Sequence, residues 1–278
     1  MKDNIILILK GFVLGIANII PGVSGGTLAI TLGIYEKLIE TISHFKDNIK
    51  KNYKFLLFLV LGIGISLLIF SNVVSFCLDK YPFATILFFI GIILGGMPKL
   101  FKKIENSFSI TNLIIGLITF GIVMSMSLLS TGNNEVSLEN LTLIKIITLF
   151  FSGAVASASM LLPGISGSFV LMLIGYYKPI INTIKELTRF NNLCHNIVIL
   201  LSVGLGIIVG IVCAAKVIEY LLKEHEIPTY YGIIGFVIAS IVSIFITALS
   251  YSVGMFQIIV GVLLLIVGIM ISRVIGDK

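Results

Sequence analysis

Residues 21–26 read Pro-Gly-Val-Ser-Gly-Gly, and residues 163–168 read Pro-Gly-Ile-Ser-Gly-Ser. Both strings interrupt apolar stretches, and they lie 142 residues apart. The same offset pairs further landmarks, which are Gly11 with Gly153, Gly33 with Gly175, Tyr35 with Tyr177, and Gly62 and Gly64 with Gly204 and Gly206. A register held over several landmarks indicates an internal duplication. We therefore expect two related halves, residues 1–140 and 141–278, with the broken motifs at 18–35 and 160–177.

The residues around these motifs indicate a membrane protein. The chain of 278 residues is 58% hydrophobic and only 12% charged, whereas soluble domains carry about 25% charged residues. No Asp, Glu, Lys or Arg occurs in residues 55–78, 146–177 or 227–272. A helix needs roughly 20 apolar residues to cross a bilayer, and barrel strands would show a two-residue alternation that is absent here. The sequence predicts an all-α polytopic membrane protein and excludes a water-soluble fold.

Each half is expected to contain the same elements in the same order. A broken helix pair comes first, and three transmembrane helices follow it. A pair that returns to its own side, followed by three crossings, makes the two halves inverted repeats, an architecture that recurs in transporters. Loop charges do not distinguish a re-entrant hairpin from two short full spans, but apolar flanks on both sides favour the hairpin. The expected pairs are 5–20 with 27–42 and 143–162 with 169–184, and the expected spans are 55–78, 83–98, 110–130, 196–221, 229–248 and 253–272, with a turn at 250–252.

The basic residues lie between the apolar segments, which predicts the orientation of the chain. Lys clusters follow residues 42 and 98, whereas residues 130–141 carry Glu135 and Glu139 without Lys or Arg. By the positive-inside rule, the N-terminus is cytoplasmic in an inner membrane, and no cleaved signal peptide is expected. The formal charge of +6 thus indicates a bilayer with anionic lipids as the partner, and not nucleic acid. The three cysteines are expected to be free thiols.

The residue types in the broken motifs suggest an anion-binding site. Proline ends the incoming helix, and the glycines let the backbone turn sharply and approach a ligand. Hydroxyl side chains lie where they can cap the outgoing helix, next to unpaired backbone N–H groups that attract a phosphate or carboxylate. Ordinary helix kinks are the alternative, and the duplication of the whole string argues against them. The candidate binding residues are Asn18, Pro21, Gly22, Ser24, Gly25, Gly26 and Thr27 in the first motif, and Pro163, Gly164, Ser166, Gly167 and Ser168 in the second.

Other positions are weaker candidates. Gly33 and Gly175 are expected to allow close helix packing. Tyr35 and Tyr177 either offer hydroxyls to a ligand or anchor helix ends at the interface, and both are accessory candidates together with Glu36. Ionisable groups inside membranes tend to be functional, so H⁺ or Na⁺ coupling through Glu36, Lys216 or Glu219 is a further hypothesis.

The motifs also resemble a known family. Residues 18–27 and 33–36, with the second copies at 163–168 and 175–177, resemble the bacterial and archaeal polyprenyl-phosphate transporter family over nearly the whole chain. The resemblance implies a flippase that returns undecaprenyl phosphate, the carrier lipid of cell-envelope synthesis, from the outer to the inner leaflet. The second copy departs from the first at Met160, Ser168 and Phe169, which implies two unequal half-sites.

Two other functions are considered. One is a transporter of another small anion, and the other is an intramembrane phosphatase that acts on undecaprenyl pyrophosphate. Hydrolysis needs a nucleophile or general base, and usually a metal or an Arg. The motifs contain no acid, Lys or Arg, and the three histidines, His44, His195 and His225, are expected in connecting loops. We therefore expect no enzyme, and no catalytic residue, metal or cofactor.

Overall fold

The computed structural model describes residues 2–19, 24–128, 136–138, 140–188 and 192–276, and within them the regular structure is entirely helical. The first half contains six of the helices, which are α1 (Lys2–Ile19), α2 (Gly25–Thr31), α3 (Tyr35–Ser43), α4 (Phe45–Lys80), α5 (Pro82–Lys103) and α6 (Ile110–Leu128). The second half contains α7 (Leu143–Leu161), α8 (Gly167–Leu173), α9 (Tyr177–Thr188), α10 (Leu193–Glu224), α11 (Glu226–Leu249) and α12 (Met255–Gly276).

The long apolar helices confirm the predicted class. Six helices in the described part of the chain, α5, α6, α7, α10, α11 and α12, are long and apolar enough to cross a membrane. The 36-residue helix α4 contains the charge-free window 55–78. Large apolar side chains such as Leu68, Leu117 and Phe256 are exposed on the outside, which suits lipid because a bilayer does not penalise apolar surface. The chain is an all-α polytopic membrane protein.

The outgoing limb of each broken pair differs from the prediction. Each limb is two short helices, α2 with α3 and α8 with α9, where one helix was expected over 27–42 and one over 169–184. The breaks fall at Gly33, with φ +67°, and at Gly175, with φ +79°. These left-handed angles are strained for residues with a Cβ atom and are readily adopted by glycine. These two glycines therefore end one helix and redirect the chain into the next, and their expected packing role stays a prediction.

Glycines allow the first helix of each half to pack closely on a long one. A Cβ at Gly62 of α4 would lie 2.2 Å from the carbonyl oxygen of Ile8 in α1. At Gly206 of α10, it would lie 1.9 Å from the carbonyl oxygen of Phe150 in α7. Ile8 and Phe150 lie 142 residues apart, but Gly62 and Gly206 lie 144 apart. The pairing of Gly62 with Gly204 is therefore wrong by two residues, and no neighbour from the described part of the chain lies within 4 Å of an ideal Cβ at Gly204.

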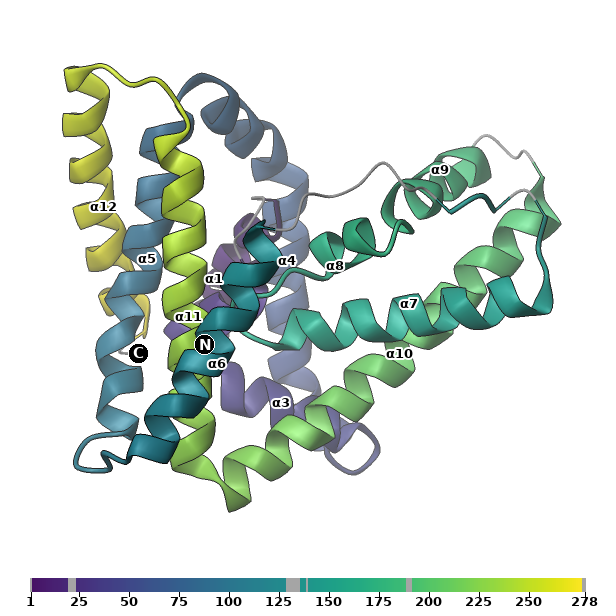
Figure 1. The fold of residues 1–278 in the computed structure, drawn as a ribbon, viewed down its shortest axis with the longest axis horizontal. Helices are drawn as coiled ribbons and strands as arrows, with labels where there is room; N and C mark the ends of the chain where they lie inside the picture. Colours follow the sequence, from purple (N-terminus) through teal and green to yellow (C-terminus); the bar gives the residue numbers. More distant parts are fainter. Residues whose placement is uncertain (1, 20–23, 129–135, 139, 189–191, 277–278) are drawn as a thin grey trace.

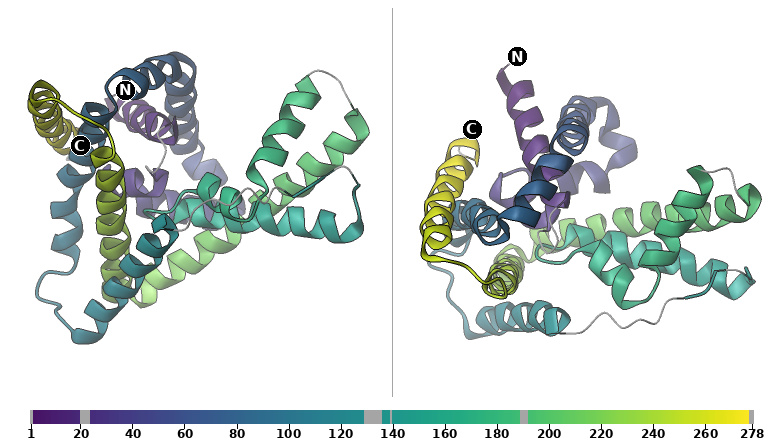
Figure 2. Two further views of the ribbon diagram at one scale, coloured as in Figure 1. Left: turned by 45° about the horizontal axis from the view of Figure 1, so that its top comes forward. Right: turned by 90° about the horizontal axis from the view of Figure 1, so that it is seen from above.

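The last two helices of each half pack against the last two helices of the other half. In Figure 1, α12 lies beside α5, and the contacts place α11 along α6. A Cβ at Gly95 of α5 would meet Ser272 of α12, and Thr119 of α6 donates a hydrogen bond to the carbonyl of Gly232 in α11. Helices α7 to α10 project from this group, as both views of Figure 2 show. Each half thus packs its last helix against the other half, while the inverted relation of the halves stays a prediction.

Candidate functional site

The two broken motifs meet in the interior, where residues from each half form hydrogen bonds across their boundary. The backbone N–H of Gly164 donates to the hydroxyl of Thr27 at 2.7 Å. The hydroxyl of Tyr35 donates to the carbonyl of Leu161 at 2.9 Å, and that of Ser24 donates to the carbonyl of Leu162 at 3.3 Å. We call this contact the seam, and it consists of Ser24, Gly26, Thr27 and Tyr35 from the first half and of Leu161, Leu162 and Gly164 from the second.

Two glycines allow the backbones to approach at the seam. A Cβ at Gly26 would lie 3.1 Å from the carbonyl oxygen of Leu161. Gly164 has φ +80°, and a Cβ there would lie 2.5 Å from the carbonyl oxygen of Phe236 in α11. The positive φ is strained for other residues, and the overlap adds to that strain. Gly164 is therefore required both by its own backbone conformation and by the neighbouring helix.

The serines of the motifs do not cap the outgoing helices as expected. Ser24 and Ser166 occupy the N-cap positions of α2 and α8, but neither makes a side-chain cap hydrogen bond. The hydroxyl of Ser24 reaches across the seam, and that of Ser166 lies 2.8 Å from the hydroxyl of Ser168. Moreover, α2 and α8 have only seven residues each, so their dipoles are weaker than the longer predicted helices would provide. Anion binding here would depend on hydroxyl groups and on the N–H of Gly164.

A cavity of about 270 Å³ adjoins the seam on one side. Gly164 and Ser166 line it, together with Ser240 of α11. Ser240 is 1% exposed, and within the described part of the chain its hydroxyl has no hydrogen-bond partner. An unpaired buried hydroxyl is costly, which makes it a ready partner for a ligand. We call this cavity the hydroxyl pocket, and its other polar lining residues are Ser127, Ser243 and Thr247.

A second cavity of about 540 Å³ adjoins the seam on the other side. It lies where α5 ends and α11 begins, and Tyr35 belongs both to its lining and to the seam. We call it the lysine chamber, because Lys37, Lys99 and Lys103 line it. Its remaining polar lining residues are Glu36, Glu40 and Tyr230.

Charged and phenolic groups are tightly paired in the lysine chamber. Lys103 Nζ lies 3.1 Å from Glu36 Oε1 and 3.3 Å from Glu226 Oε1, and the Tyr230 hydroxyl donates to Glu36. Partial burial opposes ionisation of Glu36, but the hydrogen bonds from Tyr230 and Lys103 outweigh it and hold the pKa of that carboxyl below its ordinary value. Burial raises the pKa of Tyr35, so its phenol stays protonated and donates across the seam.

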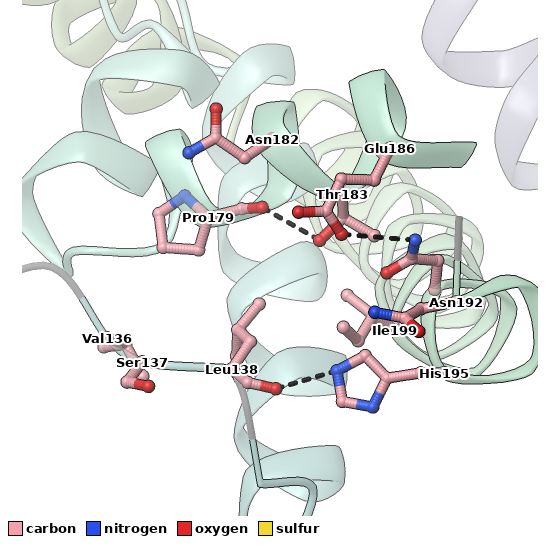
Figure 3. A pocket seen from close by; sticks show the side chains of 11 residues that line it. Val136, Ser137, Leu138, Pro179, Asn182, Thr183, Glu186, Asn192, His195 and Ile199 are labelled. Carbon is pink, nitrogen blue, oxygen red and sulfur yellow. Dashed lines mark hydrogen bonds between the residues drawn. The ribbon is translucent and has the colours of Figure 1, made fainter. Parts of the chain in front are cut away.

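A third cavity, of about 810 Å³, lies away from the seam, between the 136–138 segment, α9 and the start of α10 (Figure 3). His195 faces it and forms a 2.9 Å hydrogen bond with the carbonyl of Leu138. Its described lining contains the carboxylate of Glu186 and no Lys or Arg. An anion would therefore meet a negative charge with no cation to offset it, so this cavity is a poor phosphate site. His195 lies in the first turn of α10, not in a connecting loop as expected.

Some of the remaining candidate residues lie beside the seam, some lie elsewhere, and some lie outside the described residues. Pro21 and Gly22 lie outside the described residues, as does the side chain of Asn18, whose backbone is in α1. Gly25 begins α2, and Pro163 is fully buried beside the seam. Of the others, Gly167 begins α8 and packs on α7, Ser168 is exposed, and Tyr177 begins α9 and lines none of the three cavities.

Several residues near the site were not predicted from the sequence. Ser240, Ser243 and Thr247 recur at helical spacing on α11. That spacing of hydroxyls on one face of an apolar helix is a signal that a search for periodicity would find. Lys99 and Lys103, in contrast, were interpreted only as orientation signals. Within the described residues, no group of three or more His, Cys, Asp and Glu side chains could hold a metal ion.

Comparisons with known proteins place the chain in a family. Residues 14–258 match a family described as undecaprenyl phosphate translocase-like. The chain is 35% identical to a polyprenyl-phosphate transporter of Staphylococcus aureus (strain NCTC 8325 / PS 47) over 97% of this chain and 95% of that protein. It is 30% identical to a polyprenyl-phosphate transporter of Vibrio cholerae serotype O1 over 84% of this chain and 75% of that protein. No solved structure matches the chain.

Proposed function

The chain belongs to the undecaprenyl phosphate translocase-like family, and from this membership and the geometry of the seam we propose that it moves polyprenyl phosphate across the membrane. The observation that carries the proposal is the hydroxyl pocket, which the second broken motif borders and which Ser240 also lines, its buried hydroxyl having no partner within the described residues. A lipid phosphate needs a polar site for its head group alone, because its prenyl tail stays in hydrocarbon. A pocket of this size fits one head group while leaving the tail outside.

Transport is favoured over hydrolysis. Both relatives are transporters by name, and phosphate-ester hydrolysis would need a nucleophile or base beside a cation that stabilises developing charge. Among the described residues, the hydroxyl pocket has no charged lining residue. It can hold a phosphate by hydrogen bonds and release it unchanged, as a carrier must.

In this mechanism the seam acts as the gate between the two cavities. Gly164 lines the hydroxyl pocket and Tyr35 lines the lysine chamber, and both donate hydrogen bonds across the seam. When the seam opens, the N–H of Gly164 and the hydroxyls of Thr27 and Ser24 lose their present partners. A phosphate oxygen replaces those partners, so the cost of opening is offset by binding the head group.

The orientation of the chain belongs to the same proposal. The ends of α5 and α10 and the beginning of α11 lie together, because Lys103 pairs with Glu226 and Glu219 of α10 bonds with His44 before α4. With the Lys-rich ends cytoplasmic, the N-terminus is also cytoplasmic, and the protein lies in the inner membrane. The hydroxyl pocket then faces the outer leaflet and the lysine chamber the inner one, with the two halves inverted relative to each other.

Transport by pocket variants in proteoliposomes tests the proposal. Replacing Ser166 and Ser240 together by Ala removes two hydroxyls, and hydrogen bonds to a charged group contribute about 1.5–3 kcal/mol each. We expect transbilayer movement of labelled undecaprenyl phosphate to fall about tenfold or more. The matched control is Ser125→Ala on α6, whose hydroxyl bonds to its own helix outside the pocket. Equal transport by the double variant and the control would count against the proposal.

A further inference from the structure

The lysine chamber has an arrangement that the broken motifs do not explain. Its cations come from two helices, with Lys37 on α3 and Lys99 and Lys103 on α5. Gly33, Ile30 and Leu100 complete the wall toward α2 and the membrane-spanning part of α5. The cavity is twice as large as the hydroxyl pocket, at about 540 Å³ against about 270 Å³.

The position of the chamber relates it to the transport path. Tyr230 lines the chamber and Ser240 lines the hydroxyl pocket, and both lie on the continuous helix α11. Ten residues of helix at about 1.5 Å each separate them by about 15 Å along the axis. The seam lies between the two cavities, because it shares Tyr35 with one and Gly164 with the other. A head group that passes the seam from the hydroxyl pocket therefore enters the lysine chamber.

The contacts of Lys103 show what the chamber can bind. A carboxylate oxygen of Glu36 lies 3.1 Å from Lys103 Nζ, and the same carboxylate accepts a hydrogen bond from Tyr230. The side chain of Glu36 is 57% exposed, so it can swing out of the chamber. A phosphomonoester carries about −1.5 to −2 charges and three acceptor oxygens, more than a carboxylate offers. Such a group can take the place of Glu36 between Lys103 and Tyr230, with Lys99 and Lys37 on the same cavity wall.

We propose that the lysine chamber is a second binding site for a prenyl phosphomonoester head group, on the far side of the seam from the hydroxyl pocket, and that Glu36 is the internal anion that the head group displaces from Lys103. This inference rests on the proposed function. Glu36 returns to Lys103 when the head group leaves, which keeps the chamber from holding the lipid too tightly. The hydroxyl pocket receives the head group from one leaflet, and the lysine chamber releases it to the other.

Lysine footprinting of the full-length protein tests the site directly. The purified protein in detergent is treated with an amine-acetylating reagent, and acetylation of each lysine is measured by mass spectrometry with and without farnesyl phosphate. We expect farnesyl phosphate to protect Lys99 and Lys103, and to leave Lys102 unprotected. Lys102 is an exposed neighbour that does not line the chamber, so it serves as an internal control. Equal labelling of Lys103 with and without farnesyl phosphate would overturn the proposal.

Parallel ligands identify the chemistry that is recognised. Farnesol has the tail without the phosphate, and inorganic phosphate has the charge without the tail. Protection by farnesyl phosphate at a concentration where both of these fail supports a lipid head-group site. Equal protection by inorganic phosphate at the same concentration would show a site for free phosphate and would overturn the lipid assignment.

The role of Glu36 is tested by two variants with opposite expected effects. Glu36→Gln removes the competing charge, so half-maximal protection of Lys103 should occur at about tenfold lower farnesyl phosphate. Lys103→Gln should weaken protection of Lys99 by a similar factor, whereas Lys102→Gln should leave it unchanged. A purely structural ion pair would instead give Glu36→Gln and Lys103→Gln the same direction of change, which contradicts displacement.

Transport by the wild-type protein separates this inference from the proposed function. Movement of undecaprenyl phosphate in proteoliposomes without protection of Lys103 would leave the proposed function standing and overturn the second site. Protection of Lys103 without lipid movement would support the site and count against transport. Absence of both effects would overturn both.

Discussion

Replacing Thr27 by Val tests whether the seam is a gate held by specific hydrogen bonds. Thr27 is 0% exposed, and its hydroxyl accepts the N–H of Gly164 at 2.7 Å. Valine keeps the shape and removes the acceptor, which leaves the Gly164 N–H without this partner. In soluble proteins, a buried donor that is left without a hydrogen-bond partner lowers stability by about 1–3 kcal/mol. Interhelical hydrogen bonds in membranes contribute about 0.6 kcal/mol on average. We expect Thr27→Val to destabilise the closed seam by about 1 kcal/mol, which raises the population of the open seam about fivefold.

Hydrogen exchange measured by mass spectrometry reports this opening locally. The peptide that covers residues 161–168 should exchange about fivefold faster in Thr27→Val than in the wild type. Two further variants serve as controls for the change in exchange rate. Thr27→Ser keeps the hydroxyl and should exchange as the wild type does. Thr31→Val removes a hydroxyl that donates to the carbonyl of Thr27 within the same helix, so it should also leave the peptide unchanged. Equal exchange in Thr27→Val and Thr27→Ser would refute the assignment of Thr27 as a residue that holds the seam closed.

Three further predictions follow from the same contacts. Gly164→Ala should lower the melting temperature sharply, because a left-handed φ costs about 1–2 kcal/mol with a Cβ and the added atom overlaps the Phe236 carbonyl. The control is Gly204→Ala, where no described atom lies within 4 Å of the added Cβ, and this variant should melt as the wild type does. Tyr35→Phe removes the bond to the Leu161 carbonyl and should speed exchange of the 161–168 peptide severalfold; unchanged exchange would contradict this. The depressed pKa of Glu36 means that its pairing with Lys103 stabilises the protein above the ordinary carboxyl pKa of about 4.3 and is lost as pH falls below it. The difference in melting temperature between wild type and Glu36→Gln should therefore stay constant from about pH 5 to 8 and shrink below about pH 4; a loss between pH 8 and 6 would contradict the assignment.

The long helices and the breaks between them were predictable, because both depend on local sequence. A charge-free window long enough to cross a bilayer has few alternatives to a helix. The turn expected at residues 250–252 falls between α11 and α12, as the structure confirms. The division of each outgoing limb was missed because Gly33 and Gly175 sit in apolar sequence that also suits a continuous helix. Only their positive φ angles reveal that the chain turns there.

The contacts at the seam could not be predicted from the sequence. Thr27 and Gly164 lie 137 residues apart, and nothing in the spacing of either motif says which atoms face each other. The same serines and threonine suit a helix cap when each motif is considered alone. Their use across the boundary follows from how the two halves dock, which depends on the packing of α5, α6, α11 and α12.

The lysine chamber illustrates a different difficulty. Lys99 and Lys103 are one helical turn apart at the end of an apolar helix, where the positive-inside rule already accounts for basic residues. Their second role depends on Glu36 and Tyr230, which come from α3 and α11. Because the positive-inside rule already explains Lys99 and Lys103, the sequence gives no sign that they also line a cavity.

The most direct test of the central claim is the movement of labelled undecaprenyl phosphate across proteoliposomes that contain the wild-type protein, with phosphate release measured in the same samples. We predict time-dependent transfer of the lipid between leaflets, absent from empty liposomes and strongly reduced in the Ser166→Ala, Ser240→Ala double variant, without release of phosphate. Folded protein that leaves the lipid in its original leaflet, or that releases phosphate from it, would contradict the claim.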